Sequence, residues 1–141
     1  MILDAQHLFS DAQALTATAA STNLIDFGSD RNIGIGEPMA VVVTVDTALA
    51  GTSPTINIAV QMDDSAAFSS PVSVVTSQTY SALAQGAKVV IPIPPDTSGE
   101  RFCRLNYTLG GTTPTITVTA ALIPMNMVQN EVAYPKGYTI S

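Results

Sequence analysis

The chain has 141 residues, a length that fits one domain with a substantial core, and 46% of its residues are apolar. Only 11% are charged, against roughly 25% in an average soluble domain, and the formal net charge is −6. An acidic chain with five basic residues lacks the cationic surface that binds phosphates, so we expect no nucleic-acid partner.

The low charge favours a protein that functions within an assembly, because such a surface gains little from charge repulsion against self-association. A secreted or tag-bearing β-domain with a neutral polar surface is the alternative. The single cysteine, Cys103, excludes an internal disulfide framework and a Cys-rich zinc site, and its parity with Leu105 and Tyr107 predicts a buried thiol. No run approaches the roughly 20 apolar residues of a membrane span, and we expect no secretion signal.

Residues 1–21 are predicted to form an N-terminal arm. Residues 2–9 are interpreted as an extended arm or short strand, and residues 11–21 as a linker or irregular strand. Free termini seldom carry large apolar side chains with nothing to cover, so we expect the arm to dock on its own domain or on a neighbour. The apolar side chains of this segment are Ile2, Leu3, Leu8 and Phe9.

Residues 22–27 are predicted as a short strand and residues 31–38 as a loop. Two stretches that follow, 41–60 and 101–120, are alike: Gly-Thr-Ser-Pro-Thr-Ile at Gly51 aligns without a gap with Gly-Thr-Thr-Pro-Thr-Ile at Gly111. In each stretch a β-rich run enters a Gly/Pro turn and a second run leaves it, which predicts a β-hairpin.

Apolar residues alternate with mostly polar ones after each of these turns, and a period of two places them on one face of a sheet. Two hairpins that bury such faces against each other predict a β-sandwich. The alternating apolar residues are Ile56, Ile58, Val60, Met62, Ile116, Val118, Ala120 and Leu122.

Further strands are predicted at residues 72–80 and 88–93, the latter at a sheet edge or ending there because it is stopped by prolines. Residues 124–141 are predicted as a C-terminal arm, too apolar for a solvated tail and without the period of a long element. About eight β segments at a spacing of 8–12 residues are typical of an all-β sandwich, so we expect one domain over residues 1–141.

No catalytic constellation can be assembled from the sequence. His7 is the only histidine, and a catalytic base needs a nucleophile and an orienting partner. The acids Asp26, Asp30 and Glu37 could supply a glycosidase pair, but acids in loops are usually solvated and the chain has no Trp to bind a sugar. We expect no enzyme and no cofactor.

Asp63 and Asp64 could bind a hard cation together with backbone carbonyls, since Ca²⁺ takes six to eight oxygen ligands. The spaced acids of a calcium-binding loop are absent, however, and adjacent acids are common at turns. We expect no metal site.

The opening residues 1–16 resemble the start of the capsid cement (decoration) proteins of short-tailed bacteriophages, of the Bordetella-phage type. The similarity spans nearly the whole chain. It continues at residues 25–28, 31–34, 36–38, 63–71, 90–94 and 101–108.

This resemblance implies a jelly-roll sandwich that binds the outside of an icosahedral shell built by a different major capsid protein. It implies a dimer or trimer that clamps neighbouring capsomers on the capsid exterior of the virion, after synthesis in the host cytoplasm. No enzymatic activity, cofactor, nucleic-acid partner or membrane partner follows from it. A phage fibre or adhesion-type jelly-roll module is the alternative function.

We expect the two apolar arms to make the capsid or subunit contacts, because an oligomer that bridges several capsomers gains avidity. The competing interpretation is that the arms pack within their own protomer as strands. The expected contact residues are Ile2, Leu3, Leu8, Phe9, Tyr134, Tyr138 and Ile140.

Overall fold

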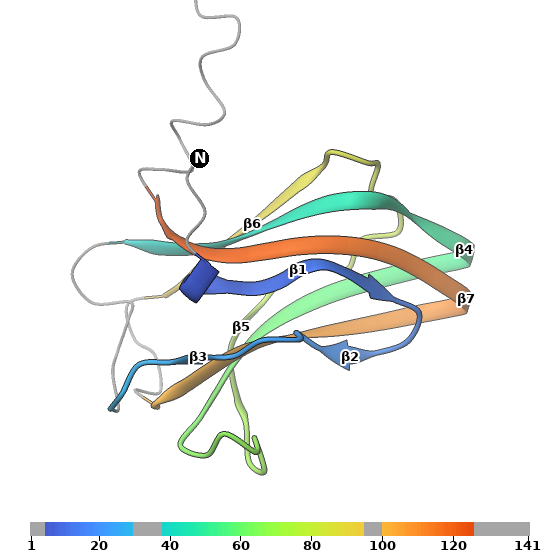
Figure 1. Cartoon of the computed structure of the whole chain (residues 1–141). Helices are drawn as coiled ribbons and strands as arrows, with labels where there is room; N and C mark the ends of the chain where they lie inside the picture. The colour runs from blue at the N-terminus through green and yellow to red at the C-terminus, as the bar shows by residue number, and fades with distance from the viewer. Residues whose placement is uncertain (1–4, 30–37, 95–99, 126–141) are drawn as a thin grey trace, which may run out of the picture.

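The computed structural model describes residues 5–29, 38–94 and 100–125. Within them every strand pairing is antiparallel, and seven strands form one hydrogen-bonded sheet (Figure 1). This confirms the all-β prediction. The elements are η1 (Ala5–His7), β1 (Leu8–Leu15), β2 (Ala19–Ala20), β3 (Ile25–Asp26), β4 (Met39–Asp63), β5 (Val72–Thr76), β6 (Lys88–Pro92) and β7 (Phe102–Pro124).

Two long strands dominate the sheet. β4 has 25 residues and β7 has 23, and they pair along their whole length, from Met39 with Pro124 to Asp63 with Phe102. In Figure 1 both strands turn back near their middle, at the right of the view, so the two-stranded ribbon folds over into two layers. The result is an antiparallel sandwich, and this wrapping agrees with the jelly-roll expectation.

Each layer contains one half of the ribbon and shorter strands beside it. In the upper layer of Figure 1, the first half of β4 and the second half of β7 lie between β6 and β1. In the lower layer, the other two halves lie between β5 and the short strands β2 and β3.

The core lies between the layers and follows the predicted alternation. The alternating residues named above are all buried, and so is Cys103, as its parity predicted. Burial raises the pKa of the Cys103 thiol to about 12, so the thiol stays protonated. Each fully buried aliphatic side chain stabilises the fold by about 1.5–3 kcal/mol.

The two predicted hairpins are wrong. Residues 41–47 do not pair with residues 55–62; instead Val41 pairs with Leu122 and Ile58 pairs with Tyr107. The two similar stretches are therefore antiparallel partners of each other. Their Gly/Pro segments are corners at which a continuous strand passes from one layer to the other.

Close approach of the two backbones explains the glycines at this corner. Gly51 and Gly111 have φ angles of +131° and +94°, a backbone conformation that is strained for residues with a side chain. A Cβ on Gly51 would lie 2.8 Å from the Thr113 carbonyl oxygen, and one on Gly111 would collide with the Ser53 carbonyl. Residue types that suit a hairpin turn thus also allow the backbones of β4 and β7 to approach closely at the corner.

The shorter segments differ in detail from the predictions. The predicted strand at residues 22–27 shrinks to β3, and that at residues 72–80 ends at Thr76, with Tyr80 forming an isolated bridge to Ile56. The predicted strand at residues 88–93 is β6. Residues 8–20 of the predicted N-terminal arm contribute β1 and β2 to the sheet, whereas residues 1–4 and 126–141 lie outside the described residues.

Candidate functional site: the outer faces of the sandwich

The outside of the upper layer is apolar. Four of its residues are only 0–3% exposed although the core lies on the opposite side of the sheet, and the half-buried Leu8 and Met125 pack against them. Val90, which pairs with Val42, continues the apolar surface and is 39% exposed. We call this surface the upper outer face; it consists of Ala40, Val42, Val90, Ala121 and Ile123.

The described ends of both predicted arms meet on this face. Leu8 begins β1 and Met125 follows β7, and both side chains contact the same apolar cluster. The Met125 amide donates a hydrogen bond to the Pro38 carbonyl at 2.8 Å, which fixes the end of β7.

The expected contact residues have different places. Leu8 lies on the upper outer face, whereas Phe9 is fully buried between the layers and holds β1 to the domain. Phe9 packs within its own protomer, as the competing interpretation of the arm has it. The remaining expected contacts lie outside the described residues: Ile2, Leu3, Tyr134, Tyr138 and Ile140.

A buried polar network anchors β1 from the other side. The Ser10 hydroxyl, 1% exposed, donates to the Gln13 Oε1 at 2.6 Å and lies 2.8 Å from the Tyr107 hydroxyl, whose proton it accepts. Gln13 Oε1 also accepts the Thr22 amide. Burial raises the pKa of Tyr107, so the tyrosine stays neutral and links the lower layer to the upper one. Sequence pattern did not reveal this pair, because its members are far apart in the chain.

The outside of the lower layer is mainly polar. We call it the lower outer face; it consists of Asn57, Ala59, Gln61, Arg104 and Asn106, which β4 and β7 present side by side. The Arg104 Nε donates to the Gln61 Oε1 at 3.0 Å, and its Cζ lies 4.3 Å from the centroid of the Phe68 ring. The two outer faces of one ribbon therefore differ in chemistry.

Of the candidate cation ligands, Asp63 is the last residue of β4, beside this face, and Asp64 follows it in the loop. Asp63 is 2% exposed, and its carboxylate accepts the amides of Ser65 at 3.1 Å and Ser70 at 2.8 Å. Hydrogen bonds from Asp64 and from the Ser70 and Ser65 amides lower the pKa of Asp63. Its oxygens hold the loop closed. In the described part of the chain, no group of three or more His, Cys, Asp or Glu could hold a metal ion.

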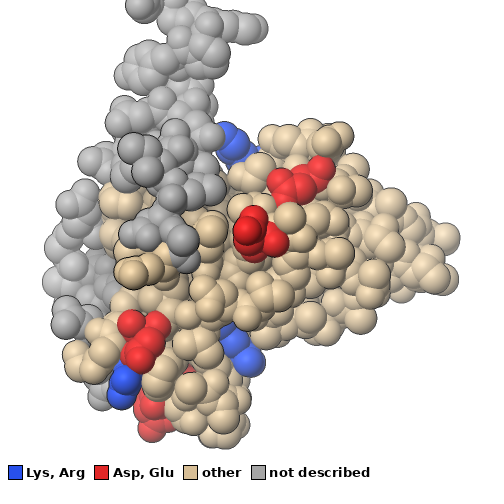
Figure 2. Space-filling model, viewed as in Figure 1, with Lys and Arg blue, Asp and Glu red and all other residues tan. Residues whose placement is uncertain are grey.

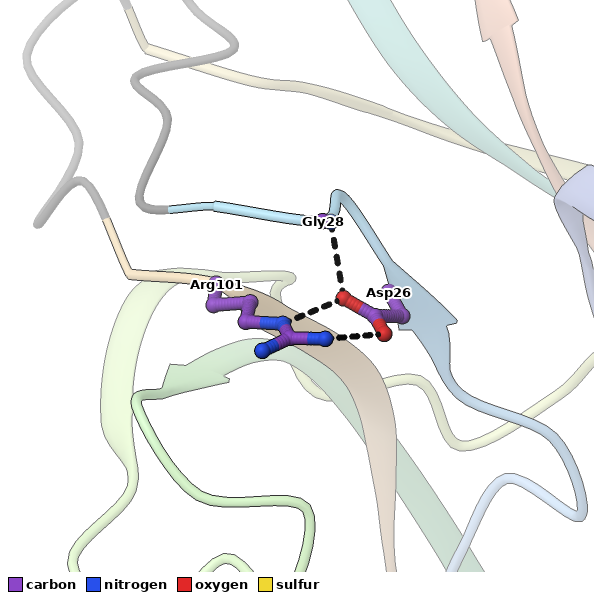
Figure 3. Close-up of polar contacts among 3 residues, drawn as sticks. All are labelled: Asp26, Gly28 and Arg101. Carbon is purple, nitrogen blue, oxygen red and sulfur yellow. Dashed lines mark hydrogen bonds and ion pairs between the residues drawn. The ribbon is translucent and has the colours of Figure 1, made fainter.

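Of the acids considered for glycosidase chemistry, Asp26 forms an ion pair (Figure 3). Both its oxygens bind the Arg101 guanidinium, at 2.8 and 2.9 Å, and the Gly28 amide donates a third hydrogen bond at 2.8 Å. The pair with Arg101 and the Gly28 amide lower the pKa of Asp26 to about 2. Asp26 thus joins β3 to the start of β7, while Asp30 and Glu37 lie outside the described residues.

Charged groups are sparse over the molecule. Figure 2 shows them at the left and centre of the view, whereas the right-hand end, formed by the corner of the ribbon, carries none. Residues 47–62 and 105–124 indeed contain no charged side chain. A shallow depression of about 250 Å³ beside β1 contains a single titratable side chain, Asp11; its lining is Leu8, Phe9, Ser10, Asp11, Thr22 and Asn23.

His7, the only histidine, lies in η1 and is half-buried. Over the described ranges, no helix reaches the length and apolar character that crossing a membrane requires.

The fold is thus an antiparallel β-sandwich with chemically distinct outer faces. A model of the Bbp16 family matches residues 9–123, which run from β1 nearly to the end of β7. The chain belongs to the Bbp16 family, whose name suggests a protein of a Bordetella phage. No curated protein matches the chain.

Proposed function

We propose that this chain is a structural virion protein that binds the outside of a bacteriophage capsid and cements neighbouring capsomers. The observation that carries the proposal is the apolar upper outer face, where Leu8 and Met125 of the two predicted arms pack on a buried cluster and Val90 lies exposed beside it. Membership of a phage-associated family supports the same role.

The mechanism follows from linkage. A protein that binds only the assembled shell stabilises it by RT ln(1 + [L]/Kd), so the effect grows with its concentration relative to the dissociation constant. A dimer or trimer that engages several copies of the major capsid protein gains avidity in addition. The role needs no catalysis, no cofactor, no nucleic acid and no membrane, and it locates the protein on the capsid exterior.

The first experiment mixes the purified protein with undecorated phage heads and sediments the mixture. We expect saturable co-sedimentation at a copy number related to the symmetry of the shell. Absence of binding to mature heads at high protein concentration would contradict the proposal. Binding to glycans or cell surfaces instead would support the alternative of a fibre or adhesion module.

A pair of deletions tests the role of the arms. Removing residues 1–4 leaves every described strand intact, so we expect weaker head binding at an unchanged melting temperature. Removing residues 1–9 also takes away Phe9, so we expect a lower melting temperature as well. Normal decoration by the shorter deletion would show that the N-terminal arm makes no shell contact.

A further inference from the structure

The lower outer face holds an arginine in an unusually fixed position. Arg101 and Arg104 both lie over an aromatic ring, with Cζ 4.9 Å from the Phe102 centroid and 4.3 Å from the Phe68 centroid, respectively. The planar fork of Arg101 is occupied by Asp26. Among the residues that the structure describes, Arg104 donates one hydrogen bond, from Nε to Gln61, and its terminal amino groups contact no acceptor.

The neighbouring loop is built to hold the ring beneath this guanidinium. Phe68 is only 6% exposed and has a φ angle of +49°, a conformation that costs energy for a residue with a Cβ. The buried Asp63 carboxylate closes the loop through the amides of Ser65 and Ser70 on either side of Phe68. The guanidinium is therefore fixed on one face by the ring and on its Nε edge by Gln61.

We propose that Arg104 is the centre of a carboxylate-binding site on the lower outer face, which takes an Asp or Glu side chain of the shell protein. This inference rests on the proposed function. A guanidinium fork matches a carboxylate with two parallel hydrogen bonds, and Arg is enriched among the residues that dominate interfaces. Because the side chain is already fixed, less conformational entropy is lost on binding.

The acid is expected from another protein because most described acids already have contacts within this chain. Asp26 binds Arg101, Asp46 accepts the Thr119 hydroxyl at 2.6 Å, and Asp63 binds backbone amides. Asp64 also has a contact.

The test compares head binding of the wild-type protein with that of Arg104→Gln and Arg104→Lys. We expect the Gln variant to bind about tenfold more weakly or worse, and the Lys variant to fall between, because a point charge cannot form two parallel hydrogen bonds. Arg101→Gln removes the same charge from an arginine whose fork already binds Asp26, and it should change the dissociation constant less than about twofold. Melting temperatures verify that the variants fold.

Chemical modification of the heads, combined with the Arg104→Gln variant, tests whether the group that Arg104 binds is a carboxylate. Heads whose surface carboxylates have been converted to amides with carbodiimide and glycinamide should lose more affinity for the wild type than for Arg104→Gln. Equal losses would overturn the carboxylate assignment. If the wild type binds heads and Arg104→Gln binds them with the same affinity, this site is overturned and the proposed function stands. If the wild type binds no heads, both are overturned. A change in oligomeric state of Arg104→Gln with unchanged head binding would assign the residue to self-contact and overturn the proposal.

Discussion

The upper and lower outer faces belong to the same two strands, yet one is apolar and the other polar. On the inner side both halves of the ribbon bury alternate residues in one core. On the outer side the upper half presents Val42 beside Ala121, and the lower half presents Gln61 beside Arg104. The alternation of apolar residues thus determines which side chains face the core, whereas the side chains on each outer face can differ in chemistry.

The sequence contains a signal for this difference. Residues 40–43 and 120–123 are continuous apolar runs, and they pair with each other in the upper layer. Continuous runs are typical of strands covered on both faces, whereas the alternation after Ile56 is typical of strands with one solvated face. The apolar outer face could have been predicted from these runs.

The largest expected effect distinguishes the two sides of β1. Phe9→Ala should lower the free energy of unfolding by about 4 kcal/mol, because it leaves a cavity between the layers. Leu8→Ala, on the half-buried outer side, should cost about 1 kcal/mol. Chemical denaturation measures both. Equal, small losses would mean that β1 is not an integral strand of the sandwich.

A matched pair of charges tests the contrast between the outer faces. Ala121→Asp places a carboxylate in the apolar upper cluster and should destabilise the fold by about 3 kcal/mol. Asn57→Asp places one beside Thr108 on the half-buried, polar lower outer face and should cost about 1 kcal/mol or less. Denaturant midpoints give both values, and a reversed order would contradict the description of the faces.

The corner that separates the faces can be strained in a controlled way. Gly111→Ala forces a Cβ against the opposite backbone and should cost about 2 kcal/mol or more. Gly86, with a φ angle of +84° and open space around its Cβ direction, is the matched control, for which about 1 kcal/mol is expected. Thermal unfolding of the two variants separates the cost of the clash with the opposite backbone from the cost of a positive φ angle alone.

The smallest effect concerns the ion pair of the lower layer. The folded-state pKa of Asp26, about 2, lies below its ordinary value of 3.8, so ionised Asp26 stabilises the fold above that value and ceases to do so as the pH falls toward 2. Asp26→Asn should melt slightly below the wild type at neutral pH and alongside it near the folded pKa. The two side chains are 41% and 44% exposed, which keeps the difference small. A gap that persists in acid would require another cause.

Local pattern predicted the fold class and the core, because burial of Ile56, Ile58 and Val60 follows from alternation alone. The hairpins failed because Gly51 and Pro54 suit a turn and a corner equally well, and the choice depends on the distant partner strand. The Asp26–Arg101 and Phe68–Arg104 contacts also join segments whose proximity only the fold establishes. The apolar cluster at the start of the chain indicated that Leu8 and Phe9 would be covered. It did not indicate that the two side chains lie on opposite sides of one strand.

The continuous ribbon also has a consequence for synthesis. Because β4 pairs with β7 throughout, residues 39–63 lack their main hydrogen-bonding partner until residues 102–124 have been made. Pairing at such separation in sequence is slow, and incomplete chains expose apolar strand edges. The two layers are therefore expected to form together, and only after residues 102–124 have been made. A partner would then meet both outer faces together, already in their final arrangement.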